Sequence, residues 1–452
     1  MADKNASLYA RHIAHRREQI DAILNELGYD ALLIHSGRQE NRLFDDQAPP
    51  FRAHGAFVSL VPQPFAADCL LELRPADTPR LWFCQPDDFW HMPPEPPASW
   101  LTESLDVEIV SAPEQWHERF AQQRATAVIG DERALGHLLD GASLNPPDLM
   151  QRLDEIRTVK TDWECRCIEQ ANHLSAAGHL AAANAYRAGA SELEIHLAYL
   201  AAVGQDQDHL PYNSIVALNA HAAVLHYQFR LPERPHDSRS FLIDAGADYR
   251  GYAADITRTW TLEEHGEFGD LIAAMDEAQR KLADRMLPGQ DYVDLHVAAH
   301  RAVAAILEQA GIVRMAPEEQ VASGVSAHFL PHGLGHFIGT QVHDVGGLAD
   351  ANGHSLPPPE HYPALRLTRR LEAGNVVTVE PGLYFIPAFL EKLAAGPHAG
   401  KVAWDAIERL QSFGGIRIED NVLVGERPVN YTRNAFAAIV AEQDAETKAE
   451  RS

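Results

Sequence analysis

Hydrophobic positions in the N-terminal third of the chain switch between helical spacing and short continuous runs. Apolar side chains recur at helical spacing from Ile13 to Leu27, and Gly28 follows as a stop signal, which predicts an amphipathic helix. The apolar run at 30–37 predicts a buried strand. Similar runs predict strands at 56–61, 69–73, 79–84 and 125–130, with a weaker pattern at 107–112. This loose alternation predicts an α/β or α+β domain of about 150 residues.

The pattern changes near residue 150 and predicts a second domain. Pro146 and Pro147 interrupt it, and a charged segment leads into a long helical region at about 163–204, so we place the boundary between residues 157 and 158. Strands are then predicted at 214–219, 223–229, 240–246, 252–260, 375–385 and 415–424, and helix at 266–311 with an interruption near 287–291. A polar, frayed tail is expected after Glu442. Strands surrounded by helices make residues 158–452 an α+β domain.

Two aspartates lie on predicted strands that a tight turn joins. If Tyr249 and Arg250 centre this hairpin, Asp244 faces Asp255 directly on one face of the sheet. Directly opposed residues have Cβ atoms about 5 Å apart, and like charges at that distance are destabilising. A cation between the two carboxylates reverses the sign of the interaction. The alternative is that one aspartate belongs to the turn and the other is solvated.

Two glutamates lie near the ends of later strands. Glu380 ends the run VVTVE, and the period of a strand places Thr378 on the same face. Glu419 shares its face with Arg417 in GIRIED. A glutamate on the inner face of a sheet needs a partner, and for Glu419 that partner is either Arg417 or a cation.

The glycine-rich segment HGLGHFIG contains two of the chain's 24 histidines. Its glycine spacing differs from that of a dinucleotide loop, and it does not lie in a βαβ unit. It suits instead a loop that brings His336 to a metal, while His332 and His343 stay free to contact substrate or to transfer a proton. For any single histidine the alternative is a surface position or a satisfied place in the core.

Taken together, four carboxylates and one imidazole form a natural ligand set for two divalent metals that share a water. This set makes the chain a candidate metal-dependent enzyme. Neither a Gly-X-Ser-X-Gly elbow nor an HEXXH helix occurs in the sequence, so serine-hydrolase and single-zinc peptidase mechanisms lack support.

Composition narrows the possible partners. The 452 residues are 46% hydrophobic and 23% charged, as in folded soluble proteins, and the length suits two domains. The net charge of −26 argues against binding to nucleic acid or to an anionic membrane. No apolar stretch reaches transmembrane length, and the first residues lack the apolar core of a signal peptide, so a cytoplasmic location is expected.

The motifs Asp244-X10-Asp255, HGLGHFIG, VEPG and RIED, in this order, resemble the ligand set of the pita-bread (M24-type) metallopeptidases. The resemblance spans about 158–435, and the preceding domain argues against a simple methionine aminopeptidase. Within the family, PYNSIVALNAHAAVLHY, HGLGHFIGTQVHDVGG and LRLTRRLEAGNVVTVEPGLYF are most similar to bacterial prolidases (Xaa-Pro dipeptidases) and organophosphorus acid anhydrolases. The resemblance implies a pita-bread catalytic domain of the α+β class, preceded by a smaller creatinase-like α/β domain.

The resemblance also implies a cofactor and its ligands. Two divalent metals are expected, Mn²⁺ with Co²⁺ or Zn²⁺ as alternatives. Asp255 and Glu419 would bridge them, Asp244 would complete one site, and His336 with Glu380 would complete the other. The metals would activate a water, and Glu380 would pass its proton to the leaving proline nitrogen.

Residues around the substrate are implied in the same way. His226, His332 and His343 would surround the dipeptide and assist catalysis, Arg366 would bind its free carboxylate, and Tyr212 would form a pocket wall. Arg417 and Thr378 would support the ligands. The implied activity is hydrolysis of Xaa-Pro dipeptides by a homodimer, with side activity on organophosphate esters and fluoridates. The alternatives are an aminopeptidase P that acts on longer peptides and a non-catalytic peptidase-like binding module. The segment 391–415 resembles a family-variable insertion.

Overall fold

The computed structural model describes residues 2–90, 92–113, 115, 120, 125–135 and 142–450. The chain divides into two compact units, Met1–Arg166 and Cys167–Ser452. The domain boundary that the sequence places between residues 157 and 158 stays a prediction. Among the residues that the structure describes, every helix is too short or too polar to cross a membrane.

The first unit is built around a mixed sheet with the strand order β4-β3-β2-β1-β5-β6. Strand β1 pairs antiparallel with β2 and parallel with β5, so the sheet combines both ladder types. The strands are β1 (Ala31–His35), β2 (Leu70–Leu73), β3 (Arg80–Cys84), β4 (Asp106–Val110), β5 (Thr126–Ile129) and β6 (Ser143–Leu144). The helices are α1 (Ala2–Leu27), α2 (Gly55–Leu60), α3 (Ser99–Thr102), α5 (Glu132–Leu135) and α6 (Pro147–Thr158). The predicted α/β character of this part is confirmed.

One strand prediction in this unit is wrong, because residues 56–61 form helix α2 and its last turn. All six residues of α2 are buried, so the segment shows neither the alternation of a strand nor the one-sided pattern of a surface helix. The His54 side chain caps the helix by accepting a hydrogen bond from the backbone N–H of Ala56 at 3.2 Å. The hydrophobic pattern alone does not distinguish a buried helix from a buried strand here, whereas the cap at His54 favours the helix.

The second unit contains short antiparallel sheets, ordered β11-β8-β7, β12-β15-β16, β10-β9 and β13-β14 in the described part of the chain. Its strands are β7 (Ile215–Leu218), β8 (Ser240–Asp244), β9 (Asp248–Tyr249), β10 (Tyr252–Ala253), β11 (Thr257–Thr261), β12 (Val376–Val379), β13 (Gly382–Tyr384), β14 (Gly415–Arg417), β15 (Asp420–Leu423) and β16 (Val429–Asn430). Its helices are α8 (Glu192–Val203), α9 (Glu267–Ala283), α10 (Tyr292–Gln309), α11 (Pro317–Ala322), α12 (Pro387–Ala394), α13 (Trp404–Leu410) and α14 (Tyr431–Glu450), together with α7 (Asp162–Arg187), which begins before the division.

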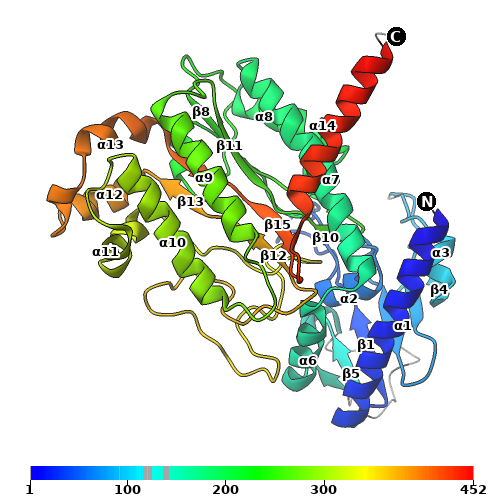
Figure 1. The fold of residues 1–452 in the computed structure, drawn as a ribbon. Helices are drawn as coiled ribbons and strands as arrows, with labels where there is room; N and C mark the ends of the chain where they lie inside the picture. The colour runs from blue at the N-terminus through cyan, green and yellow to red at the C-terminus, as the bar shows by residue number, and fades with distance from the viewer. Residues whose placement is uncertain are drawn as a thin grey trace. The chain divides into compact units, whose positions relative to one another are not determined.

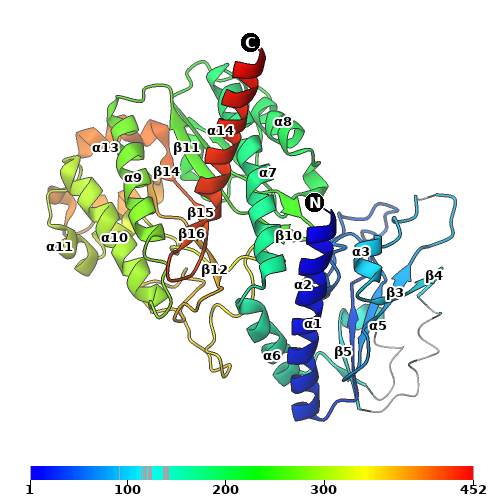
Figure 2. The ribbon, with the colours of Figure 1, turned by 45° about the vertical axis from the view of Figure 1, so that its right-hand side comes forward.

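Helices pack on these strands in two groups. Helices α9 and α10 lie side by side (Figure 1) and share one large core with β12, β13 and β14. Helices α7 and α8 share a second core with β7 and β8. Helix α14 runs beside α7 in both views (Figures 1 and 2), where Ala435 and Ile439 contact Ala176. The strands next to the predicted ligands are thus packed against helices.

Three further expectations are corrected in this unit. The helical region at 163–204 is two helices, because Gly189 takes a positive φ of 76° and Ser191 starts α8 with a capping box. The strand expected at 223–229 does not form: Ala223 ends a short 3₁₀ turn, Asn219–Ala223, and residues 224–229 are irregular. The tail expected to fray after Glu442 continues as α14 to Glu450.

Candidate metal centre

The hairpin that carries the two aspartates has a different register from the one expected. Its turn is centred on Arg250 and Gly251, with φ values of 56° and 85°, as in a type I′ turn. Consequently Tyr249 pairs with Tyr252, and Asp244 pairs with Thr257 and not with Asp255. The shift is two residues, and an even shift keeps the side chains on their predicted face.

A hydroxyl group connects the two aspartates. The Tyr212 hydroxyl lies 2.8 Å from Asp244 Oδ1 and 2.6 Å from Asp255 Oδ1. The two carboxylates therefore lie close together, as the sequence predicts, although they are not paired residues. Tyr212, which was expected at a pocket wall, lies against the acids themselves.

His336 is positioned by a close approach between its loop and strand β12. A Cβ on Gly335 would lie 2.2 Å from the Thr378 carbonyl oxygen, so only glycine fits at this position. Thr378 then binds His336 twice: its Oγ1 accepts from the His336 N–H at 3.0 Å, and its own N–H donates to the His336 carbonyl at 2.9 Å. Thr378 thus supports the histidine.

The imidazole of His336 has one nitrogen available for a metal. Its Nδ1 donates to the Phe337 carbonyl at 2.9 Å, which fixes the tautomer. Nε2 lies 3.5 Å from Asp255 Oδ2 and 3.7 Å from Glu380 Oε1. Burial lowers the pKa of His336 to about 4, so the ring is neutral at physiological pH, as a metal ligand must be.

Glu419 lies between strands β14 and β15 and lines the same cavity as His336. It forms an isolated antiparallel bridge with Thr257, whose hydroxyl donates to Glu419 Oε2 at 2.6 Å. Ligand atoms of Asp255, His336 and Glu419 lie within 4.8 Å of one another, which is close enough for a shared cation. Asp244 and Glu380 line the same cavity, which has a volume of about 280 Å³. All five predicted ligands therefore meet in one place.

The acids at this centre are electrostatically strained without a cation. Burial, followed by repulsion from Asp244, raises the pKa of Asp255 well above its ordinary value. Burial, followed by repulsion from Glu419, raises the pKa of Glu380 well above its ordinary value. Burial, followed by repulsion from Asp255 and Asp244, does the same for the pKa of Glu419. Four carboxylates and one neutral imidazole are hard and borderline donors that suit divalent cations such as Mn²⁺ or Zn²⁺. The donor set therefore fits a metal pair.

Arg417 supports the centre in a way the sequence predicted only in part. Its Nη2 donates to Asp244 Oδ2 at 2.7 Å, whereas it reaches Glu419 only through the hydroxyl of Thr257, at 3.1 Å from Nε. Its Nη1 donates to the Tyr384 hydroxyl at 2.8 Å, which in turn lies 2.9 Å from His332 Nε2.

Thr257 and Tyr384 are residues that the sequence analysis did not single out. Thr257 lies two positions after Asp255 and hence on the same strand face, which was an available signal. Tyr384 gave no signal in the sequence, because its partners Arg417 and His332 lie far from it along the chain.

His332 donates from Nδ1 to the Gly333 carbonyl at 2.8 Å. Burial, followed by the charge of Arg417, lowers the pKa of His332 to about 3.

The remaining predicted residues lie around the cavity. His226, His343 and Arg366 are exposed and line it together with His332. The ring of His343 lies edge-on to that of His336, with 4.4 Å between their centroids. The guanidinium of Arg366 adds a positive charge to a cavity that four carboxylates also line.

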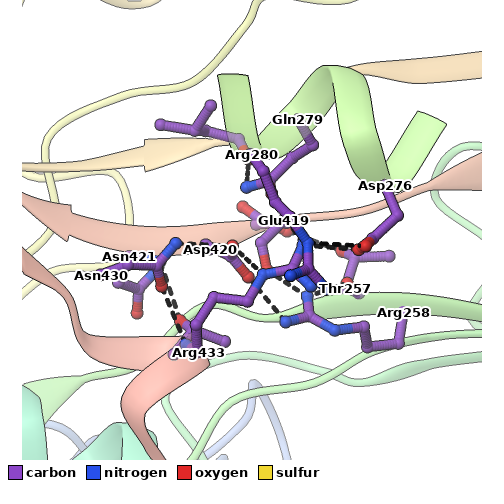
Figure 3. Close-up of polar contacts among 12 residues, drawn as sticks. Thr257, Arg258, Asp276, Gln279, Arg280, Glu419, Asp420, Asn421, Asn430 and Arg433 are labelled. Carbon is purple, nitrogen blue, oxygen red and sulfur yellow. Dashed lines mark hydrogen bonds and ion pairs between the residues drawn. The ribbon is translucent and has the colours of Figure 1, made fainter. Parts of the chain in front are cut away.

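A partly buried ion cluster beside Glu419 fixes strand β15 (Figure 3). Asp420 accepts from Arg258 Nη2 at 2.7 Å and from Arg433 Nε at 2.8 Å, and Arg433 also pairs with Asp276 of α9. Burial would raise the pKa of Asp420, but the two guanidinium groups lower it to about 2. Arg258 also donates to the main-chain oxygen of Glu419 at 2.8 Å. The ligand strand is thereby anchored to α9 and α14.

Comparison with known proteins agrees with this geometry. The model of metallopeptidase family M24 matches residues 166–426, and that of the Xaa-Pro dipeptidase N-terminal domain matches residues 7–154. An Xaa-Pro dipeptidase of Pseudoalteromonas atlantica is 42% identical over 95% of this chain and 98% of its own length. One from Xanthomonas campestris pv. campestris is 43% identical, over 95% and 98% of the two chains.

Solved structures support the fold. Aminopeptidase P from E. coli with the inhibitor Pro-Leu has a TM-score of 0.70 at 23% identity and covers 96% of this chain and 99% of its own. Proline aminopeptidase P II from Yersinia pestis has a TM-score of 0.68 at 22% identity, over 94% and 96%. The expected pita-bread architecture with its preceding α/β domain is confirmed. With its two family matches and its relatives above 40% identity, the chain belongs to metallopeptidase family M24.

Proposed function

We propose that this protein is a metal-dependent dipeptidase that hydrolyses Xaa-Pro dipeptides. The observation that carries the proposal is the convergence of four carboxylates and one neutral imidazole on one cavity of about 280 Å³. The relatives named Xaa-Pro dipeptidase match nearly the full length of both chains, which supports the substrate class.

We assign the ligands as the sequence predicted. Asp255 and Glu419 would be shared by the two metals, Asp244 would complete one site, and His336 and Glu380 would complete the other. The mutual proximity of Asp255, His336 and Glu419 supports this division. The metals are Mn²⁺, with Co²⁺ or Zn²⁺ as substitutes. When bound, such a pair supplies a nucleophile from water at neutral pH and polarises the peptide carbonyl.

The side chains around the metal pair have separate roles in proton transfer and substrate binding. Glu380 takes the proton of the attacking water and returns it to the proline nitrogen as the peptide C–N bond breaks. His332 lines the cavity, and its Nδ1 lies 3.7 Å from Glu380 Oε2, so its ring lies beside this proton path. His226 and His343 line the opening, and Arg366 binds the C-terminal carboxylate of the dipeptide.

The alternative function is that of an aminopeptidase P, which would accept peptides extended beyond proline. The structures with TM-scores near 0.70 belong to that class, but at 22–23% identity they support the fold alone. The exposed guanidinium of Arg366 at the cavity favours the dipeptidase, because a free carboxylate next to proline exists only in a dipeptide substrate. We also propose that the enzyme is a homodimer, as the family resemblance implies, and that it has side activity on organophosphate fluoridates.

The deciding experiment compares three substrates with the Mn²⁺-loaded enzyme. Ala-Pro is expected to be hydrolysed at least about tenfold faster, by kcat/KM, than Ala-Pro-Ala or Ala-Ala. Equal rates on Ala-Pro and Ala-Pro-Ala would replace the dipeptidase by an aminopeptidase P. Loss of all hydrolysis with metal bound would support a binding module. A Glu380→Gln variant serves as the control for contaminating peptidases.

A further inference from the structure

The main chain of Asp255 is held by a side chain and not by a neighbouring strand. Asp255 lies between β10, which ends at Ala253, and β11, which begins at Thr257. The carboxamide of Asn421 binds both of its main-chain groups: Nδ2 donates to the Asp255 carbonyl at 2.6 Å, and Oδ1 accepts from the Asp255 N–H at 3.0 Å. The side chain therefore makes the two bonds that a paired strand residue would make.

The orientation of the Asn421 carboxamide is itself fixed by buried neighbours. Asn172 Nδ2, on α7, donates to Asn421 Oδ1 at 3.0 Å and also to the Ile168 carbonyl at 2.9 Å. Thr432, on α14, accepts from the Asn421 N–H at 2.9 Å and donates to Asn172 Oδ1 at 2.6 Å. Asn172, Asn421 and Thr432 are each 0% exposed. The Asn421 carboxamide therefore cannot turn over without breaking three bonds, two to Asp255 and one from Asn172.

This arrangement connects two of the proposed ligands through one short segment. Asn421 lies two residues after Glu419, on strand β15, beside the ion cluster of Figure 3. Glu419 is bonded to Thr257 on one side, and Asn421 is bonded to Asp255 on the other. The segment 419–421 thus contacts the chain at 255–257 through two side chains, which fixes the separation of the Asp255 and Glu419 carboxylates.

We propose that Asn421, held by Asn172 and Thr432, is a positioning residue that sets the spacing of Asp255 and Glu419 and thereby the affinity for the metal pair. The proposal rests on the function proposed above, in which these two carboxylates bridge the metals. Asn421 itself does not contact metal or substrate. It acts by keeping Asp255 in place against the repulsion of the neighbouring acids.

The test compares Mn²⁺ binding to the metal-free full-length proteins by titration calorimetry. Asn421→Asp keeps the size and one acceptor but loses the donor to the Asp255 carbonyl, so affinity is expected to fall about tenfold or more. The matched control is Asn375→Asp, another 0% exposed asparagine, whose Oδ1 accepts from the Glu372 N–H in a turn. Its Mn²⁺ affinity is expected to stay within about twofold of the wild type.

A second measurement reports directly on the geometry of the two bound Mn²⁺ ions. The electron paramagnetic resonance spectrum of two spin-coupled Mn²⁺ ions depends on their bridging ligands, so Asn421→Asp should change it and Asn375→Asp should not. If Asn421→Asp does not fold, Asn172→Ala takes its place, since it removes one support from the carboxamide and should weaken binding in the same direction.

The two proposals fail in different ways. A wild type that binds no Mn²⁺ would overturn the proposed function together with the role of Asn421. A wild type that binds two ions with the same affinity and spectrum as both the Asn421 and Asn172 variants would overturn the positioning role alone.

Discussion

At the scale of single residues, residue types and their spacing along the chain predicted the candidate metal ligands. The hydrogen-bond partners of these residues depended on the folded chain. Asp244, Asp255, His336, Glu380 and Glu419 line one cavity, as their residue types and order along the chain indicated. Arg417 was expected to orient Glu419, yet its direct carboxylate partner is Asp244. A pattern along one strand shows which face a side chain occupies, whereas its partner comes from a strand distant in sequence. The individual roles stay predictions until variants are measured.

Arg366 provides the residue-scale test of substrate recognition. A hydrogen bond to a charged group contributes about 1.5–3 kcal/mol, so Arg366→Ala should lower kcat/KM for Ala-Pro about 10- to 100-fold, chiefly through KM. Steady-state kinetics on Ala-Pro measures this, with Arg370→Ala, an exposed arginine on the same segment, as the control. An unchanged KM would show that another group binds the carboxylate.

At the scale of elements, buried polar side chains decided where hydrophobic patterns failed. Residues 223–229 have a strand-like sequence, but the carboxylate of Glu192 at the start of α8 binds Tyr227 within this segment and residues on both sides of it. Glu192 accepts from His221 Nδ1 at 2.7 Å, from the Tyr227 hydroxyl at 2.8 Å, and from the backbone N–H of Leu218 and Leu231 at 3.0 Å. These four bonds replace a strand ladder and fix the loop that carries His226.

Glu192 therefore gives a prediction about that loop. Glu192→Gln loses the charge and one of the two acceptor oxygens, so the loop should loosen and kcat/KM for Ala-Pro should fall about tenfold, as expected for broken buried bonds to a charged group. Affinity for Mn²⁺ should stay unchanged, because no proposed ligand lies on the loop. Glu308→Gln, exposed on α10, is the control. Wild-type kinetics in Glu192→Gln would contradict the anchoring role.

A second element-scale prediction concerns acid stability of the first unit. Glu164 is 2% exposed and pairs with Arg16 of α1. Burial alone would raise the pKa of Glu164, but the charges of Arg16, His12 and Lys160 lower this pKa from 4.5 to about 2. A carboxylate with a lowered folded-state pKa stabilises above its unfolded value, and the contribution is lost as pH falls from about 4.5 towards 2. It amounts to about 3 kcal/mol.

Thermal unfolding from pH 6 to pH 3 measures this contribution. The difference in midpoint between the wild type and Glu164→Gln should be largest near pH 6 and should shrink steadily below about pH 4.5, where Glu164 begins to be protonated in the unfolded chain. Glu18→Gln, exposed on α1, should show no such trend. A pH-independent difference would mean that Glu164 acts through packing and not through charge.

At the scale of the whole molecule, the acidic centre links metal binding to stability. Ions that bind only the folded state stabilise it by about 2.7 kcal/mol per site at one hundred times Kd. Removal of metal with a chelator should therefore lower the unfolding midpoint by about 5–10 °C, and added Mn²⁺ should restore it. Differential scanning fluorimetry measures the shift. Glu419→Ala should lose most of the response, whereas an equal midpoint with and without metal in the wild type would contradict the dinuclear site.

The sequence by itself determined the residue types of the centre, their order, their strand faces and most helices and strands, because these depend on local spacing and propensity. Only the tertiary structure decided the pairing of Asp244 with Thr257, the hydroxyl of Tyr212 between two aspartates, the loop fixed by Glu192 and the hold of Asn421 on Asp255. Each of these joins buried polar groups from separate segments. A buried polar group needs a hydrogen-bond partner wherever packing places it. The periodicity of the sequence does not show which residue will be that partner.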